Sequence, residues 1–214
     1  MSGILDLLNS DLGKTIVSGV SGQAGQSQEK TSNLLTMAMP VLMQAMKRNA
    51  STPQGAEGLL GALNNKHDGS ILDNLDGLFG GGVDQSVMDD GGKILGHVLG
   101  GRQQNVERAL SNKSGIDAGS VGNILKVAAP ILMGVLGKQK RQQGVRDQGG
   151  LEGLLGGMMK GSSPQQEQSF LESILDADGD GSIIDDVAGM VLGGGQKKKK
   201  SGLGSLLGGL FGKK

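Results

Sequence analysis

The same apolar segment occurs twice in this chain, each time with a proline at the same position in its middle. The two copies are NLLTMAMPVLMQAMKR at residues 33–48 and NILKVAAPILMGVLGK at residues 123–138. Six further aligned pairs are apolar in both copies (34/124, 37/127, 39/129, 41/131, 45/135 and 46/136), so the pattern predicts an internal duplication of one helical unit. The identical pairs are Asn33/Asn123, Leu35/Leu125, Ala38/Ala128, Pro40/Pro130, Leu42/Leu132 and Met43/Met133.

Apolar residues elsewhere in the chain recur with the spacing of one helical face. Residues 151–159 and 203–211 share this spacing and read GLEGLLGGMMKG and GLGSLLGGLFGK with their flanks. Since little of the sequence alternates with a period of two, we expect an all-α protein. It would have two tandem, internally duplicated helical units with glycine-rich joints and a C-terminal amphipathic helix. The expected boundaries are 1–100, 101–195 and 196–214.

Prolines, glycines and polar side chains predict where some helices begin or break. Pro40 predicts a kink or a split in the first copy, because proline lacks a backbone donor and disfavours helix at the residue before it. Ser32 is expected to cap that helix, and Asp117 or Ser120 the helix of the second copy. The glycine pair at 91–92 predicts an interruption in the helix around it.

Composition limits both the core and the chemistry. The 214 residues include no Cys, Trp or Tyr and only three Phe, so aliphatic and Met side chains must fill the core. The absence of cysteine excludes disulfides and thiolate chemistry. The N-terminus has no basic start followed by a long apolar run, and no apolar run reaches the length expected to span a bilayer. These features predict a soluble, cytoplasmic protein.

An acidic stretch at residues 176–186, DADGDGSIIDD, looks like the first part of an EF-hand loop. Alternate carboxylates on a tight turn converge on one hard cation, glycine at the sixth position allows the bend, and the seventh residue offers its carbonyl. The sequence therefore predicts a Ca²⁺ site. Its ligands would be Asp176, Asp178, Asp180, Ser182 and Asp185.

The loop departs from the EF-hand pattern at its last position. Val187 stands where the bidentate Glu is expected, which predicts weak binding or an irregular cage completed by Asp185 or Asp186. The alternative is structural, because residues 182–185 also fit a helix capping box. In the first half, HDGSILDNL keeps the serine and aspartate of that box at residues 70–73 but lacks the carboxylate ladder. There the structural interpretation is favoured.

The C-terminal stretch is strongly basic. Residues 197–200 are lysines, as are Lys213 and Lys214, so the rest of a chain with zero net charge carries a net six negative charges. Lysines flanking an apolar helical face suit an anionic membrane surface. The face could equally pack on the protein itself or on a partner copy, and the same motif at residues 151–159, without lysines, favours self-packing or oligomerisation. Nucleic-acid binding would lack its usual aromatic stacking partners.

Catalysis has little support in the sequence. The two histidines, His67 and His97, have no Ser or Cys partner in any recognisable pattern. His67 is expected in a loop, and His97 partly buried on a helix. The glycine-rich stretches do not form a phosphate-binding loop, which needs Gly-Lys-Ser/Thr after a strand. We therefore expect a protein that is not an enzyme.

The second copy and its upstream sequence, GGRQQNVERALSNKSGIDAGSVG, resemble the YidB-like family of uncharacterised bacterial proteins (domain of unknown function 937). The shared features are a short helix at residues 106–110, a turn, the proline-bearing VGNILKVAAPILMGVL helix and the LLGGLFGK end. The likeness covers most of the chain and implies a helical bacterial protein, but no activity. The predicted function is a non-enzymatic interaction or self-assembling protein, with a homo-oligomer or another protein as partner. The alternative is a peripheral membrane-binding protein.

Overall fold

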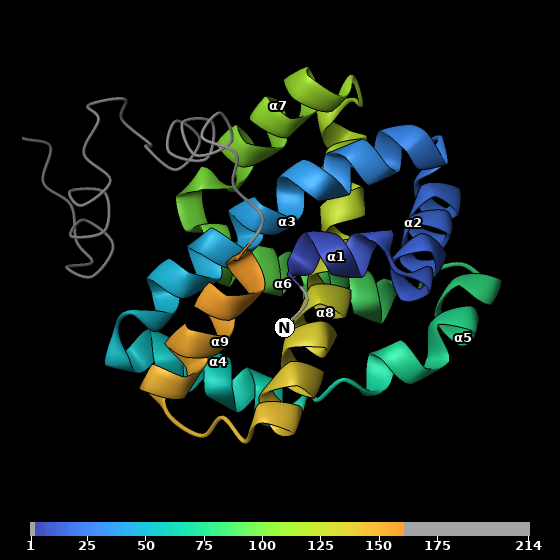
Figure 1. The fold of residues 1–214 in the computed structure, drawn as a ribbon. Coiled ribbons are helices and arrows are strands. Elements are labelled where there is room, and N and C mark those ends of the chain that lie inside the picture. The colour runs from blue at the N-terminus through green and yellow to red at the C-terminus, as the bar shows by residue number, and fades with distance from the viewer. Residues whose placement is uncertain (1–2, 161–214) are drawn as a thin grey trace, which may run out of the picture.

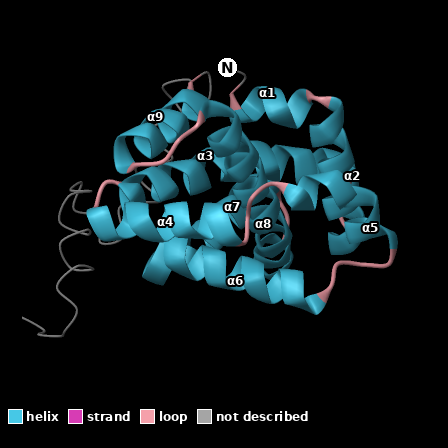
Figure 2. Cartoon of the chain, turned by 90° about the horizontal axis from the view of Figure 1, so that it is seen from below, coloured by secondary structure: helices cyan, strands magenta, loops and turns pink. Residues whose placement is uncertain are grey.

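The computed structural model describes residues 3–160, and within that range all regular elements are helical. The expected all-α class is confirmed for this part of the chain. Figure 1 and Figure 2 show the helices packed around one another with short connections. The elements are α1 (Ile4–Asn9), α2 (Asp11–Ala24), α3 (Gln28–Ala50), α4 (Pro53–Asn65), the 3-10 helix η1 (Ser70–Asn74), α5 (Leu75–Gly80), α6 (Gln85–Leu99), the 3-10 helix η2 (Gly100–Arg102), α7 (Gln103–Ser114), α8 (Ala118–Gln143) and α9 (Gln148–Met159).

The centre of the fold is α8, which carries the second proline-bearing copy. Every residue from 127 to 137 is buried, because α2, α3, α4, α6, α7, α9 and η1 all contact this helix. Contrary to the sequence-based expectation, α8 is long and apolar enough to span a membrane by length and composition. However, 78 % of its most apolar window is buried inside the fold, as in the core helix of a globular protein.

The first proline-bearing copy forms α3, and Pro40 lies inside it. The helix is therefore not split at this residue, and the other predicted outcome, a kink, stays a prediction. Pro130 likewise lies within α8. An interior proline costs a helix roughly 3 kcal/mol relative to alanine. Both prolines are buried among apolar neighbours, so tertiary packing offsets this local cost.

One hydrophobic core holds residues from both sides of the expected boundary at residue 100. The helix that precedes each copy contacts the long helices of both copies: α2 contacts α3 and α8, and α7 also contacts both. The helices after the copies do the same, because α4 and α9 each contact both α3 and α8. The two long helices are thus enclosed by a shared set of neighbours.

Helix starts follow side-chain caps, but not all of the expected ones. Ser27 caps α3, because its hydroxyl accepts a hydrogen bond from the Lys30 amide (3.3 Å), whereas Ser32 lies inside the helix. Asp117 caps α8 through a 2.9 Å hydrogen bond from the Ser120 amide, which decides between the two predicted caps. Ser27 lies five residues before Ser32, the predicted cap. The polar stretch at residues 21–30, which precedes the first copy, is therefore mostly helical.

The predicted interruption at residues 91–92 is also wrong, because α6 runs without a break from Gln85 to Leu99. Gly91 is buried against α8, and a Cβ atom added there would collide with the backbone carbonyl of Lys126. A Cβ atom added at Gly92 would meet nothing within 4 Å. Gly91 therefore allows two helix backbones to approach closely, and its role is packing rather than helix termination.

We expect Gly91→Ala to destabilise the protein by about 1–3 kcal/mol, because the new methyl group must displace a helix backbone. Gly92→Ala is the matched control, and it should be neutral or stabilising by about 0.5–1 kcal/mol through helix propensity. Urea unfolding followed by circular dichroism measures both free energies. Equal effects of the two substitutions would show that the α6–α8 contact is not tight at Gly91.

Candidate functional site

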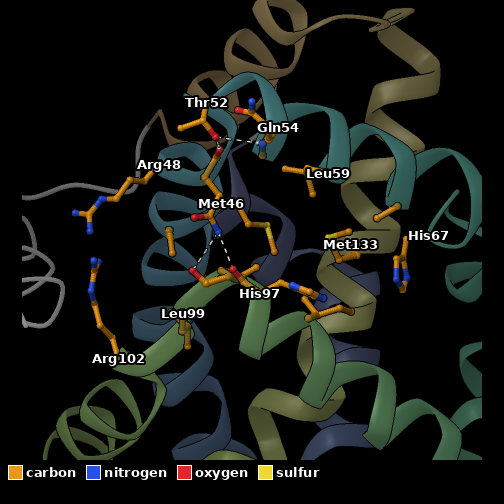
Figure 3. A pocket seen from close by; sticks show the side chains of 17 residues that line it. Met46, Arg48, Thr52, Gln54, Leu59, His67, His97, Leu99, Arg102 and Met133 are labelled. Atoms are coloured by element: carbon orange, nitrogen blue, oxygen red, sulfur yellow. Dashed lines mark hydrogen bonds between the residues drawn. The ribbon is translucent and has the colours of Figure 1, made fainter. Parts of the chain in front are cut away.

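A pocket of about 510 Å³ lies between the α3–α4 corner and the end of α6 (Figure 3). This volume is in the range of ligand-binding pockets. Its walls come from segments that are far apart in the sequence, and most of the side chains that form them are apolar. The larger apolar side chains are Met46, Leu59, Ile94, Leu99 and Met133.

Hydrogen bonds between helix ends hold the pocket open. The Asn49 side-chain amide donates to the carbonyls of His97 (3.0 Å) and Val98 (3.2 Å), in the last turn of α6. These carbonyls belong to the group that a helix end leaves without intrahelical partners. The Thr52 hydroxyl donates to the Asn49 carbonyl (3.1 Å) and accepts from the Gly55 amide (3.1 Å) to cap α4. The ends of α3 and α6 and the start of α4 are thereby joined.

Among residues 3–160, the ionisable side chains that line the pocket are all basic. They are Arg48, Arg102, His67 and His97, and none of the Asp and Glu residues in this range lines it. In Figure 3 the two arginines lie on the same side of the pocket, and their side chains extend away from the other lining residues. Guanidinium groups form strong paired hydrogen bonds with carboxylates. The site is therefore suited to an apolar group that carries negative charge.

His67 lies between α4 and η1, in the predicted loop, and it is only 7 % exposed. Burial lowers the pKa of His67 below 6.5, although Asp90, whose carboxylate lies 3.6 Å from Nε2, acts in the opposite direction. His67 is therefore mainly neutral at pH 7. His97 is exposed, so its expected partial burial is wrong. His97 lies in the last turn of α6, and its backbone carbonyl accepts a hydrogen bond from the Asn49 side chain.

The predicted cation ligands Asp176, Asp178, Asp180, Ser182 and Asp185 lie outside the described residues, as does the basic tail. The calcium site and the membrane-binding tail therefore stay predictions. Within residues 3–160, no group of three or more His, Asp or Glu side chains could hold a metal ion.

The first-half counterpart of the acidic loop joins η1 to α8. The expected cap by Ser70 is wrong, because Gly69 occupies the cap position with a φ of 107° and Ser70 is the first residue of η1. The Asp68 carboxylate accepts hydrogen bonds from the Ser70 amide (3.0 Å) and from an Arg141 side-chain nitrogen on α8 (3.2 Å). The hydrogen bonds from Ser70 lower the pKa of Asp68, so its carboxylate is the favoured form.

Sequence reasoning did not find the pocket. Its basic residues come from the end of α3, the loop after α4, the end of α6 and η2, and no spacing in the sequence connects them. Only the packing of α6 on α3 and α8 brings them to one place.

We expect protonation of His67 to destabilise the fold. Its folded pKa is below 6.5, so its contribution to stability is complete above pH 6.5 and is lost as pH falls from 6.5 toward the folded value. Between pH 7.5 and pH 5.5, the free energy of unfolding should therefore fall less for His67→Gln than for the wild type. Urea unfolding at the two pH values measures this difference, with His97→Gln as the control. Identical pH dependence in wild type and His67→Gln would contradict the assignment.

Comparison with known proteins identifies the family of the chain. The model of a bacterial protein family of unknown function (DUF937) matches residues 6–139 and 150–214. No curated protein and no solved structure matches the chain. The matched residues include both proline-bearing copies, the acidic stretch and the basic tail. The chain therefore belongs to the DUF937 family of bacterial proteins.

Proposed function

We propose that this is a non-enzymatic helical interaction protein whose pocket docks an apolar protein segment carrying carboxylates. The observation that carries the proposal is the combination of an apolar interior with two arginines and two histidines, and without an acidic lining residue from the described part of the chain. Burying one aliphatic side chain of the partner contributes about 1.5–3 kcal/mol. A carboxylate beside it adds charge-assisted hydrogen bonds to the guanidinium groups.

A binding role fits the pocket better than a catalytic one. Asn49 and Thr52 are the polar side chains whose hydrogen bonds are fixed at the pocket wall, and both are engaged with helix ends. Few preorganised polar groups then remain to orient a small substrate, as an enzyme requires. The basic groups are long arginine side chains at one end of the pocket, which suit a flexible charged partner.

We also propose that the chain is internally duplicated, with glycine joints at equivalent positions. Gly25 ends α2 with a φ of 62°, and Gly115 ends α7 with a φ of 66°. Two residues after each glycine comes the cap of the long helix, Ser27 before α3 and Asp117 before α8. The separation between these pairs equals that between Pro40 and Pro130. Joint, cap and proline therefore follow a single alignment of the two copies.

The proposed docking site can be tested with three synthetic peptides that share a central Ile-Ile pair. Aspartates flank the pair in the first peptide, glutamines in the second and lysines in the third. NMR of methyl-labelled methionines in the full chain should show shifts at Met46 and Met133, which line the pocket, and none at Met158 in α9. The aspartate peptide should bind at least about tenfold more tightly than the lysine peptide, the equivalent of about 1.4 kcal/mol.

Arg48→Gln and Arg102→Gln should each weaken binding of the aspartate peptide, whereas Arg108→Gln should not, because Arg108 is exposed on α7 and does not line the pocket. Equal binding of all three peptides would contradict the role of the arginines. If none of the peptides shifted Met46 or Met133 at millimolar concentration, the pocket would not be a docking site.

A further inference from the structure

We infer that the pocket is occupied in the intact protein by the chain's own acidic segment, residues 174–187, acting as an intramolecular competitor for partners. This inference rests on the proposed docking function. It names the occupant and predicts a regulation of the site. Three observations support it: the charge of the segment, its apolar residues, and the place where the described chain ends relative to the pocket.

The segment has the chemistry that the pocket selects. Residues 161–196 contain seven acidic side chains and no Lys or Arg, and the pair Ile183-Ile184 lies between Asp180 and Asp185. An adjacent pair of aliphatic residues with carboxylates on both sides matches an apolar pocket with arginines at one end. The acidic side chains are Glu167, Glu172, Asp176, Asp178, Asp180, Asp185 and Asp186.

The other apolar segment beyond residue 160 has the wrong charge for this pocket. Residues 203–211 carry the apolar helical spacing, but lysines at 197–200 and 213–214 flank them. Docking that segment would bring lysines beside Arg48 and Arg102, and like charges repel at close range. The charge of the two segments thus favours the acidic one as the occupant.

The tether length also suits docking within one molecule. Gln148, at the start of α9, donates to the carbonyls of Ala50 (3.2 Å) and Ser51 (3.3 Å), which lie between the pocket residues Asn49 and Thr52. The 12 residues of α9 extend about 18 Å from this corner to the last described residues. The 22 residues from 161 to 182 would span about 23–28 Å as a flexible chain. Because span and distance match, the effective concentration of the segment is about 1 mM.

Self-occupancy at this concentration has a measurable consequence. If the acidic segment itself binds the pocket with an intrinsic Kd of about 0.1 mM, an effective concentration of about 1 mM would lower the apparent affinity of a partner peptide about tenfold. A partner that binds the pocket must therefore displace the segment. Partners that bind too weakly to displace the acidic segment would not occupy the pocket.

The test compares the full-length wild type with Ile183→Ser/Ile184→Ser, and uses Leu206→Ser/Leu207→Ser as a matched control in the basic tail. Without added peptide, the first double substitution should move the methyl signals of Met46 and Met133, and the control should leave them unchanged. The aspartate peptide should bind the first variant about tenfold more tightly than the wild type. Both substitutions lie outside residues 3–160, and unchanged melting temperatures would verify that the helical core is intact.

The outcomes separate this inference from the proposed function. Equal peptide affinity and unchanged methyl signals in wild type and Ile183→Ser/Ile184→Ser would overturn self-occupancy and leave the docking function standing. Failure of the peptide to bind any variant would overturn both. If the Met46 and Met133 signals of the wild type changed with protein concentration between about 10 μM and 1 mM, a second copy would supply the segment, and the intramolecular form would be wrong.

Discussion

The close packing of α8 against its neighbours is the constraint on which the rest of the structure depends. With no Trp or Tyr and three Phe in the chain, the core lacks the rigid aromatic side chains that usually fill the space between helices. The helices compensate by approaching closely at glycines. Gly91 contacts the backbone of α8, and Gly137 contacts the His67 carbonyl so closely that neither position has room for a Cβ atom. Small residues and flexible aliphatic side chains together give the dense contact that a stable interior needs.

The same packing creates the pocket. Because α6 lies on α8, the end of α6 reaches Asn49 at the end of α3, and two hydrogen bonds join the helices there. α8 supplies Met133 to the lining, and the tight contact at Gly137 positions the backbone of His67. The basic side chains are then gathered on a wall to which residues 3–160 contribute no carboxylate. A site built in this way is defined by its shape, its apolar area and its charge, and the proposed docking function rests on these three properties.

The two proline-bearing copies differ where the pocket is formed. Met46, Arg48 and Asn49 line it in the first copy, and the aligned positions of the second copy hold Leu136, Lys138 and Gln139. Leu136 is buried in the core and Lys138 is exposed, and neither lines the pocket, whereas Met133 of the same copy does.

The all-α class could be predicted from the sequence, because apolar spacing along a helix is a local property. The cap at Asp117, one of two predicted, was equally local, since it needs only a carboxylate near the first amides of a helix. The sequence alone also determined the family, through residues that the family model matches over most of the chain. The split that was one of two expected outcomes at Pro40 and the interruption expected at Gly91 do not occur, because burial against other helices outweighs a local helix penalty of about 1–3 kcal/mol. The pocket was beyond sequence reasoning for the same reason. Its residues meet only when helices distant in the chain pack together, and tertiary packing energy decides that arrangement.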